Sequence, residues 1–337
     1  MNIDKLKDQF NDENSCRHFF ESVIWVDGRK CPHCQCNKSY LLKGASVRSG
    51  TYECARCKRQ FTVTTKTPMH STKLSFWKWL QAIYYIVNSS KGISSVILAQ
   101  WIGVSQPTAW RMGHAIREMM MPTSQNARLT GIVELDEKYF GGKPRYQPGV
   151  THKRGRGTSK QWILIAVERQ GSVRSQPVKN DSINNLSPVI KQFVQPDAHL
   201  MTDQHMSFRK IAKNYAGHST VNHLRKEYCL GDTHTNTAES FSAMLERTKL
   251  GVFHYMSNKH LSRYLNEMGF RWDHRIPEIK ITKNGKKKKY MRPMPFMARL
   301  ISLLSRCAGR QVRRTHNCGI TSFDNCSFGN LQPYYCS

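Results

Sequence analysis

The stretch GIVELDEKYFGGK, residues 131–143, opens with a β-branched apolar run and predicts a β-strand. It holds three acidic residues, Glu134, Asp136 and Glu137, within four positions of a chain that has 52 Lys and Arg but only 23 Asp and Glu. Two interpretations compete: a strand whose polar face is acidic, or a strand that presents a carboxylate to a metal ion. Because side chains alternate along a strand, Glu134 and Asp136 share one face and Glu137 points to the other.

The segments that follow predict a mixed α/β sheet. Strands are expected at residues 160–170, 172–178, 198–203 and 219–224, and helices at residues 183–194, 204–215 and 234–250. Three early strands followed by alternating helices and strands are the order expected of a ribonuclease H-like fold.

Three carboxylates stand out by their places in this pattern. Asp136 lies in the first strand, Asp203 ends a later strand, and Glu239 lies on the helix after the sheet, with 35 residues between the last two. Mg²⁺ prefers oxygen ligands, and phosphoryl transfer commonly uses two metal ions ~3.5–4 Å apart. Taken singly, Asp203 could be a helix N-cap and Glu239 a solvated helix residue. Their order and spacing favour a metal site, with Glu134 as a neighbour of Asp136 that could be mistaken for a ligand.

The composition indicates a polyanionic partner. The formal net charge is +29 at pH 7, and the partner that best matches such a charge is nucleic acid, because Lys and Arg that neutralise phosphates release condensed counterions. The N-terminus is acidic and lacks the apolar segment of a secretory signal, and no run approaches the ~18 apolar residues of a membrane span. We therefore expect a cytoplasmic, nucleoid-associated protein with no membrane partner, in a compartment where paired cysteines hold metal more often than they form disulfides.

Four of the eleven cysteines form two CxxC pairs. Cys31 and Cys34 are separated from Cys54 and Cys57 by nineteen residues that suit short hairpin strands. Two such pairs complete a closed tetrahedral shell for one structural Zn²⁺, which indicates a zinc ribbon. Neither His33 nor Cys36 has a counterpart in the second pair, so both are expected to lie outside the ligand set.

Residues 91–120 predict a helix-turn-helix. Ser94 or Ser95 can cap a first helix that carries Ile97, Leu98 and Trp101; Gly103 supplies the turn; Ser105 can cap a second helix with Pro107 in its first turn. A small residue four positions before the turn glycine, Ala99, lets the helices cross closely, as in DNA-binding motifs. The alternative is a plain helical hairpin. On the DNA-binding interpretation the second helix presents these side chains outward: Gln106, Thr108, Arg111, His114 and Arg117.

Two further segments are strongly basic. Residues 138–160 hold seven Lys and Arg and no acidic residue, and we expect this loop to grip DNA phosphates beside Asp136, chiefly through Lys143, Arg145, Lys153 and Arg154, and to pair with Glu137. A solubilising loop is the alternative. Residues 280–293 are either a solvated linker or a DNA contact, and residues 295–314 are expected to form one basic amphipathic helix.

These motifs together resemble the bacterial insertion-sequence transposases of the ISXO type, which join a zinc ribbon and helix-turn-helix to a DDE catalytic core. The similarity covers roughly residues 16–275. It rests on these stretches, in the family's order: WVDGRKCPHC (25–34), YECARCKRQFTVTTKTPMH (52–70), GISSVILAQWIGVSQPTAWRM (92–112), VELDEKYFGGK (133–143), MTDQHMSF (201–208) and the segment from HTNTAESFSAMLERTKL (234–250) to residue 275.

The resemblance implies that Asp136, Asp203 and Glu239 are the DDE triad, with His234 and Asn236 in the local signature before the glutamate. It implies an enzyme that binds the inverted repeats of its element and uses two Mg²⁺ or Mn²⁺ to cleave 3′ ends and join them to target DNA, as a homodimer or larger assembly. Many DDE transposases carry Lys or Arg seven residues after the glutamate.

In this sequence that position is Glu246, so Arg247 or Lys249 would take the DNA-contacting role, or the copy is weakened. The alternatives to an active transposase are therefore a decayed or domesticated DNA-binding regulator, and a simple nuclease that never joins ends. The expected organisation is an N-terminal helical segment (1–25), the zinc ribbon (26–70), the helix-turn-helix domain (71–125), the catalytic core (130–276) and a basic tail (277–337).

Overall fold

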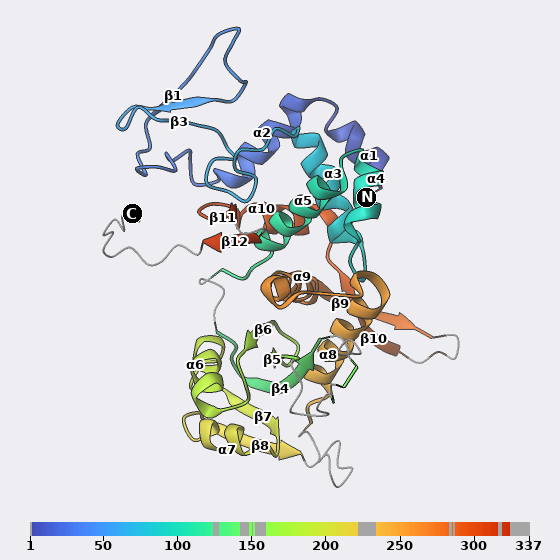
Figure 1. The fold of residues 1–337 in the computed structure, drawn as a ribbon. Helices are drawn as coiled ribbons and strands as arrows, with labels where there is room; N and C mark the ends of the chain where they lie inside the picture. The colour runs from blue at the N-terminus through green and yellow to red at the C-terminus, as the bar shows by residue number, and fades with distance from the viewer. Residues whose placement is uncertain are drawn as a thin grey trace. The chain divides into compact units, whose positions relative to one another are not determined.

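The computed structural model describes residues 2–123, 128–141, 148–149, 151, 160–221, 234–282, 285, 287–315 and 319–323. The chain forms two compact units (Figure 1). Unit 1 comprises Met1–Asn88, Ser95–Met119 and Pro295–Ser337, and unit 2 comprises Ser89–Ser94 and Met120–Met294. Each unit is described below by itself.

Unit 2 is built on a five-stranded mixed sheet in the order β6-β5-β4-β7-β8. The strands β4, β5 and β6 are antiparallel neighbours, whereas β7 and β8 run parallel to β4. Their bounds are β4 Ile132–Phe140, β5 Gln161–Glu168, β6 Val173–Val178, β7 His199–Asp203 and β8 Gly217–Val221. The predicted mixed α/β sheet is confirmed, and its central strand begins in the stretch GIVELDE.

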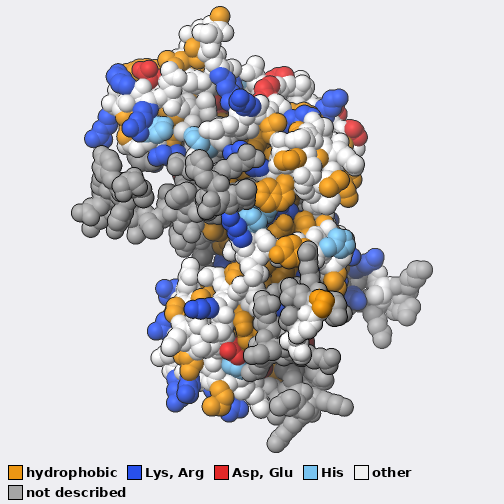
Figure 2. Space-filling view, viewed as in Figure 1, with side chains coloured by type: hydrophobic (Ala, Val, Ile, Leu, Met, Phe, Trp, Pro, Cys, Tyr) orange, Lys and Arg blue, Asp and Glu red, His pale blue; other side chains and the backbone are white. Residues whose placement is uncertain are grey.

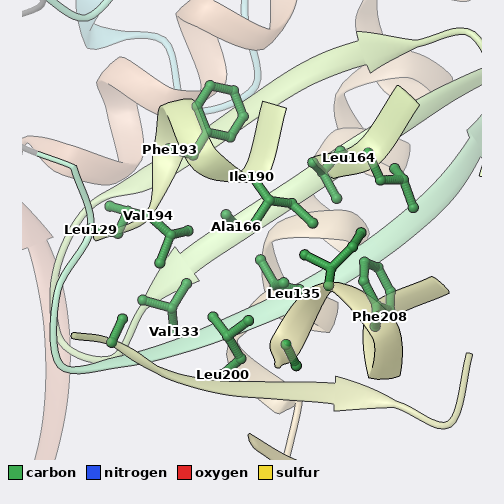
Figure 3. Packing of buried hydrophobic residues seen from close by; sticks show 14 of the residues in the cluster. Leu129, Val133, Leu135, Leu164, Ala166, Ile190, Phe193, Val194, Leu200 and Phe208 are labelled. Carbon is green, nitrogen blue, oxygen red and sulfur yellow. The ribbon is translucent and has the colours of Figure 1, made fainter. Parts of the chain in front are cut away.

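Helices cover both faces of this sheet, as the continuous burial of β5 from Trp162 to Val167 requires. On one face α6 (Ile183–Phe193) and α7 (Met206–Ala212) pack against Val133 and Leu135 of β4 (Figure 3). On the other face α8 (Asn236–Thr248) and α9 (Leu261–Asp273) pack against Phe140. Odd-numbered residues of β4 therefore face α6 and α7, and even-numbered residues face α8.

Unit 2 ends in shorter elements after α8. A π-helical turn, η3 (Lys249–Phe253), and a 3₁₀ turn, η4 (Asn258–His260), join α8 to α9. A two-stranded antiparallel ribbon of β9 (Arg275–Ile281) and β10 (Lys287–Pro293) follows α9.

Unit 1 joins N-terminal and C-terminal segments. Its helices are α1 (Ile3–Gln9), α2 (Glu13–Ile24), α3 (Phe76–Asn88), α4 (Ser95–Ile102), α5 (Gln106–Met119) and α10 (Phe296–Leu304). The short strands β1 (Ser39–Leu41), β2 (Tyr52–Cys54) and β3 (Gln60–Phe61) form one antiparallel sheet, and β11 (Gln311–Thr315) pairs with β12 (Gly319–Phe323) in another. A capping box starts α2, where Asp12 and Ser15 each bond the other's backbone N–H.

The single long helix expected at residues 295–314 is wrong. The helix α10 ends at Leu304, and Gly309, with a φ of +78°, turns the chain into β11. The helix packs against α2 and α3: Phe296 lies 5.0 Å from Tyr84, and Arg299 donates to the Val87 carbonyl at 2.6 Å. Residues 296–304 therefore belong to the core of unit 1.

Candidate active site and zinc centre

The three acidic residues of the triad lie at the carboxyl end of two parallel strands and on the helix above them. Ile132, Val133 and Glu134 pair with His199, Leu200 and Met201, so extending that register by two residues sets Asp136 beside Asp203. Neighbouring strands lie about 4.8 Å apart, so the two carboxylates leave the sheet as close neighbours on one face. Glu239 is in the first turn of α8, which packs on that face.

Asp136 is held in place and electrostatically strained. Its Oδ2 accepts a hydrogen bond from Ser242 Oγ of α8 at 3.0 Å. Burial raises the pKa of the Asp136 carboxyl to about 6, and the charges of Asp203 and Glu239 also raise it, against the lowering effects of Ser242 and Lys138. Both partner carboxylates are thus close enough to act on Asp136, and the positive charge of Lys138 offsets only part of their effect and of the burial.

Of the other two carboxylates, Asp203 is half-buried and Glu239 is exposed. Asp203 accepts the backbone N–H of His205 at 3.0 Å, and His205, not Asp203, is the N-cap of α7. Glu239 is exposed and receives a long 3.4 Å bond from Thr235 Oγ1. Asn236, the first residue of α8, is exposed as well. Exposed oxygens at this edge are accessible to cations and to a nucleic-acid backbone.

Glu134 has a different role from that of Asp136. It is fully buried, and its carboxylate accepts the N–H groups of Thr237 (2.7 Å) and Ala238 (3.1 Å) at the start of α8. Thr237 Oγ1 and Arg169 Nε donate to it as well, each at 2.9 Å. Glu134 therefore caps, from the sheet face that α8 covers, the helix that carries Glu239. This is a favourable place for a carboxylate because helix N-termini carry free N–H groups and partial positive charge.

Arg169 extends this network to β7 and to the segment before α8. Its Nη2 donates to the carbonyl of His234 at 3.2 Å and contacts Met201 Sδ of β7 at 3.0 Å. The His234 Nδ1 lies 3.2 Å from Glu134 Oε1. The pair of Glu134 and Arg169 thus connects β4, β7 and the segment that leads into α8.

The position of Glu246 is surrounded by cations. Its carboxylate lies 3.9 Å from Lys138 Nζ of β4 and 3.5 Å from Lys249 Nζ. Lys249 also donates to the Gly141 carbonyl at 2.8 Å and lies over the Phe140 ring, while Arg247 is exposed. Among the predicted DNA contacts in the core, Lys143, Arg145, Lys153 and Arg154 lie outside the described residues, so the pairing expected for Glu137 stays a prediction.

In unit 1 the four predicted cysteine ligands converge. Their sulfurs all lie within 4.8 Å of one another, with 3.7 Å between Cys31 and Cys57 and 3.5 Å between Cys34 and Cys54. A tetrahedral zinc with bonds of about 2.3 Å needs sulfurs about 3.8 Å apart, so the set fits Zn²⁺. Within the parts of the chain that the structure describes, this is the one group of such residues gathered tightly enough for a single ion.

The two cysteine turns have matching backbones. The residue that follows the second cysteine of each pair has a left-handed conformation, with φ of 62° at Gln35 and 56° at Lys58. Cys36, by contrast, points its sulfur to the Lys38 carbonyl at 3.7 Å, and neither it nor His33 belongs to the cluster. The fold around the site is a small core of Trp25, Tyr52 and Phe61.

The helices α4 and α5 are joined by the turn that the sequence predicts at Gly103. Gly103 turns the chain with a φ of +62°, and Val104 donates to the Ala99 carbonyl at 3.1 Å. Gln106 and Arg111 are exposed and Thr108 is half-buried. Of the three apolar residues assigned to α4, only Leu98 is buried; Ile97 is 42 % and Trp101 55 % exposed.

The expectation that His114 and Arg117 face outward is wrong. His114 is fully buried with its ring 4.4 Å from Trp110, and Arg117 is only 4 % exposed. Every residue of α5 from Met112 to Met119 is buried, and the absence of a side chain at Gly113 makes room for the Arg117 guanidinium. The exposed part of α5 is therefore its first turn and a half.

Comparison with known proteins matches a part of each unit. Residues 128–273 match the ISXO2-like transposase domain, a DDE-type domain, and residues 11–60 match the transposase zinc-ribbon domain. These two stretches are therefore similar to two domains of transposases. A further relative is an uncharacterized protein in transposable element ISH50 of Halobacterium salinarum, 27% identical over 275 residues, which cover 78% of this chain and 91% of that protein.

Solved structures show a weaker similarity to this chain. A pre-cleavage Mos1 transpososome is 13% identical with a TM-score of 0.26, covering 59% of this chain and 73% of that one. The Mos1 strand transfer complex is 12% identical with a TM-score of 0.25, covering 59% and 72%. Scores this low support no argument, and the assignment rests on the domain matches. No helix within the described residues has the length and apolar character to cross a membrane.

Sequence reasoning missed Arg169 and Ser242 and left Glu134 without a role. Alternation along β4 placed Glu134 on the right face, but its partners come from a helix start 103 residues later in the chain. Ser242 follows Glu239 by one helical turn, so the i, i+3 spacing was the one available signal that it shares a helix face with Glu239.

Proposed function

We propose that this chain is an active DNA transposase whose metal site is formed by Asp136, Asp203 and Glu239. The observation that carries the proposal is the placement of Asp136 beside Asp203 under α8, with a pKa raised to about 6 by burial and by its two acidic neighbours. A site where three carboxylates lie together and the nearby cation Lys138 offsets only part of their charge is suited to divalent metal.

The chain's own residues supply position and charge. Asp136, oriented by Ser242, and Asp203 would hold metal from adjacent strands, Glu239 would complete the set from the helix, and Asn236 would orient DNA at the helix start. Two Mg²⁺ or Mn²⁺, when bound, would supply activation of the attacking oxygen and stabilisation of the leaving oxygen. Phosphoryl transfer of this kind relies on positioning and charge, so we expect no covalent protein intermediate.

We further propose that the zinc ribbon and the exposed start of α5, with Gln106, Thr108 and Arg111, bind the terminal inverted repeats. The basic loop at residues 138–160 would contact phosphates beside the scissile bond, together with Arg247 and Lys249. Figure 2 shows Lys and Arg at many places on the viewed face and Asp and Glu at few. Because two ends are cut together, the working form would be a homodimer or larger assembly on DNA.

The test uses the full chain with duplexes that carry the repeats flanking its gene, in Mg²⁺ or Mn²⁺. Wild type should nick the 3′ ends and join them to a target plasmid, and Asp136→Asn should bind the ends equally well but give no joined product. Arg247→Ala tests whether Arg247 takes the DNA-contacting role of the cation that Glu246 replaces. This variant should give less joined product than wild type, with the same melting temperature. If wild type binds the ends but does not nick them, the chain is a DNA-binding regulator. If it nicks the ends but never joins them to the target, it is a simple nuclease.

A further inference from the structure

The segment that sequence reasoning left as either a linker or a DNA contact is a regular two-stranded ribbon. The strands β9 and β10 pair along seven residues each, with Lys280 opposite Lys288, Glu278 opposite Tyr290 and Ile276 opposite Arg292. All seven residues of β10 are exposed. An isolated two-stranded hairpin is only marginally stable in water, so stability alone does not explain why this exposed segment forms a regular ribbon.

The charged side chains of this ribbon repel one another and lower its stability. Residues paired across a ribbon share a face, so Lys280, Lys288 and Arg292 lie on one side. Like charges placed directly opposite each other, as in the pair of Lys280 and Lys288, destabilise a hairpin. The one acidic residue of the two strands, Glu278, already accepts from Tyr290 Oη at 2.6 Å and lies 3.3 Å from Arg292 Nε.

Excess positive charge therefore remains on both faces. Lys280 and Lys288 on one face, and Lys287 and Lys289 on the other, have no acidic partner among the described residues. Figure 2 shows Lys and Arg side chains gathered over this part of unit 2. A polyanion would relieve the repulsion and release its counterions on contact.

The base of the ribbon is fixed to the catalytic helices. Arg275 stacks on the Trp272 ring at 3.7 Å and donates to the Trp272 carbonyl, and Met294 N–H closes the base onto the His274 carbonyl at 2.9 Å. Trp272 of α9 in turn contacts Phe241 of α8 at 5.5 Å. The ribbon thus projects from the helix pair that carries Glu239 (Figure 1).

We propose that the β9–β10 ribbon is a duplex-DNA contact that grips phosphates through Lys280 and Lys288, with Lys287, Lys289 and Arg292 beside them. This inference rests on the proposed function in that it assigns one more DNA surface to the transposase. A two-stranded ribbon has the width that the major groove of B-DNA admits, about 12 Å. Contacts made through phosphates would be independent of base sequence.

The competing occupant is a second copy of the chain. On the face away from Lys280, the side chains of Ile279 and Ile281 are 66 % and 65 % exposed, and Met291 is 42 % exposed. We favour DNA because Lys287 and Lys289 border those apolar side chains, so two copies joined through this face would bring like charges together.

The test compares Lys280→Gln/Lys288→Gln with Lys5→Gln/Lys7→Gln in the full chain. The control makes the same change in net charge on α1, where both lysines are exposed and lie beside Asp4 and Asp8. The probe is a fluorescein-labelled 30-base-pair duplex of arbitrary sequence, titrated by anisotropy at several KCl concentrations. Each lost phosphate contact lowers the slope of log K against log salt by about 0.9, so the ribbon variant should lose up to about 1.8 and the control none.

A ribbon variant with the slope and affinity of the control would overturn the proposal. It would also be overturned if Ile279→Ser/Ile281→Ser changed the sedimenting mass of the free protein while Lys280→Gln/Lys288→Gln left the salt slope unchanged. Failure of the proposed function shows differently: wild type would bind the duplex through the ribbon but join no ends in Mg²⁺.

Discussion

Substituting Asp136 by Asn should stabilise the metal-free protein, although it removes a residue proposed as essential. The pKa of this carboxyl is about 6 in the folded chain against an ordinary value of 3.8, so the folded state binds the proton more tightly than the unfolded state. Stability is therefore lost as the pH rises from about 4 through 6, and the loss levels off above that range. Asn carries no charge and avoids the loss.

The magnitude follows from the same two values. One pKa unit corresponds to about 1.4 kcal/mol, so the rise from 3.8 to about 6 corresponds to about 3 kcal/mol above pH 7. In a domain of this size 1 kcal/mol moves the melting temperature by roughly 2–4 °C, which gives roughly 6–12 °C for Asp136→Asn. At pH 4 the same substitution should have almost no effect, because the carboxyl is then largely protonated in the folded state.

The assay is scanning calorimetry of the full chain at pH 4 to 8 without added Mg²⁺ or Mn²⁺ and without chelator, which would strip the zinc. Asp8→Asn, at an exposed position on α1, is the control and should stay within about 0.5 kcal/mol of wild type. Added Mn²⁺ should raise the melting temperature of wild type more than that of Asp136→Asn. A variant that melts with or below wild type at pH 8 would refute the reasoning.

Three further predictions concern other parts of the chain. Glu134→Gln should lower the free energy of unfolding in urea by about 3–5 kcal/mol, because it breaks a buried pair and weakens the cap of α8. Cys34→Ser should abolish the zinc content measured by plasma mass spectrometry, whereas Cys36→Ser should leave it at one ion per chain. Arg111→Ala should weaken binding to the inverted repeat without changing the melting temperature, whereas Arg117→Ala, at a buried position, should lower the melting temperature.

The order of elements in unit 2 was predictable because it depends on local patterns. Alternation through Val133 and Leu135 fixes the inward face of β4, and helical periodicity fixes α6 and α8. The cysteine spacing likewise predicted the cluster of unit 1, because each CxxC pair is closed by its own tight turn.

The features that could not be predicted from the sequence depend on packing between segments that are distant in the chain. The polar residues His114 and Arg117 look solvent-facing from their types alone, but that half of α5 is buried in the folded chain. The length of α10 depended on a single left-handed glycine, Gly309. The ribbon was not predicted because a Lys-rich run has low strand propensity. Residues 287–293 form a strand because they pair with Arg275–Ile281.

The acidic cluster in GIVELDEKYFGGK resolves into two carboxylates with opposite surroundings on one face. Glu134 accepts four hydrogen bonds, two of them from a helix start and one from a guanidinium, which fills the capacity of an ionised carboxylate. Asp136, two residues on, accepts one bond from Ser242 and lies near two further negative charges. A cation offered to this face would gain little at Glu134, where it would displace existing donors, and much at Asp136. The fully satisfied carboxylate thus fixes α8, and the carboxylate beside it, with one hydrogen bond and two acidic neighbours, is the one that we propose as a metal ligand.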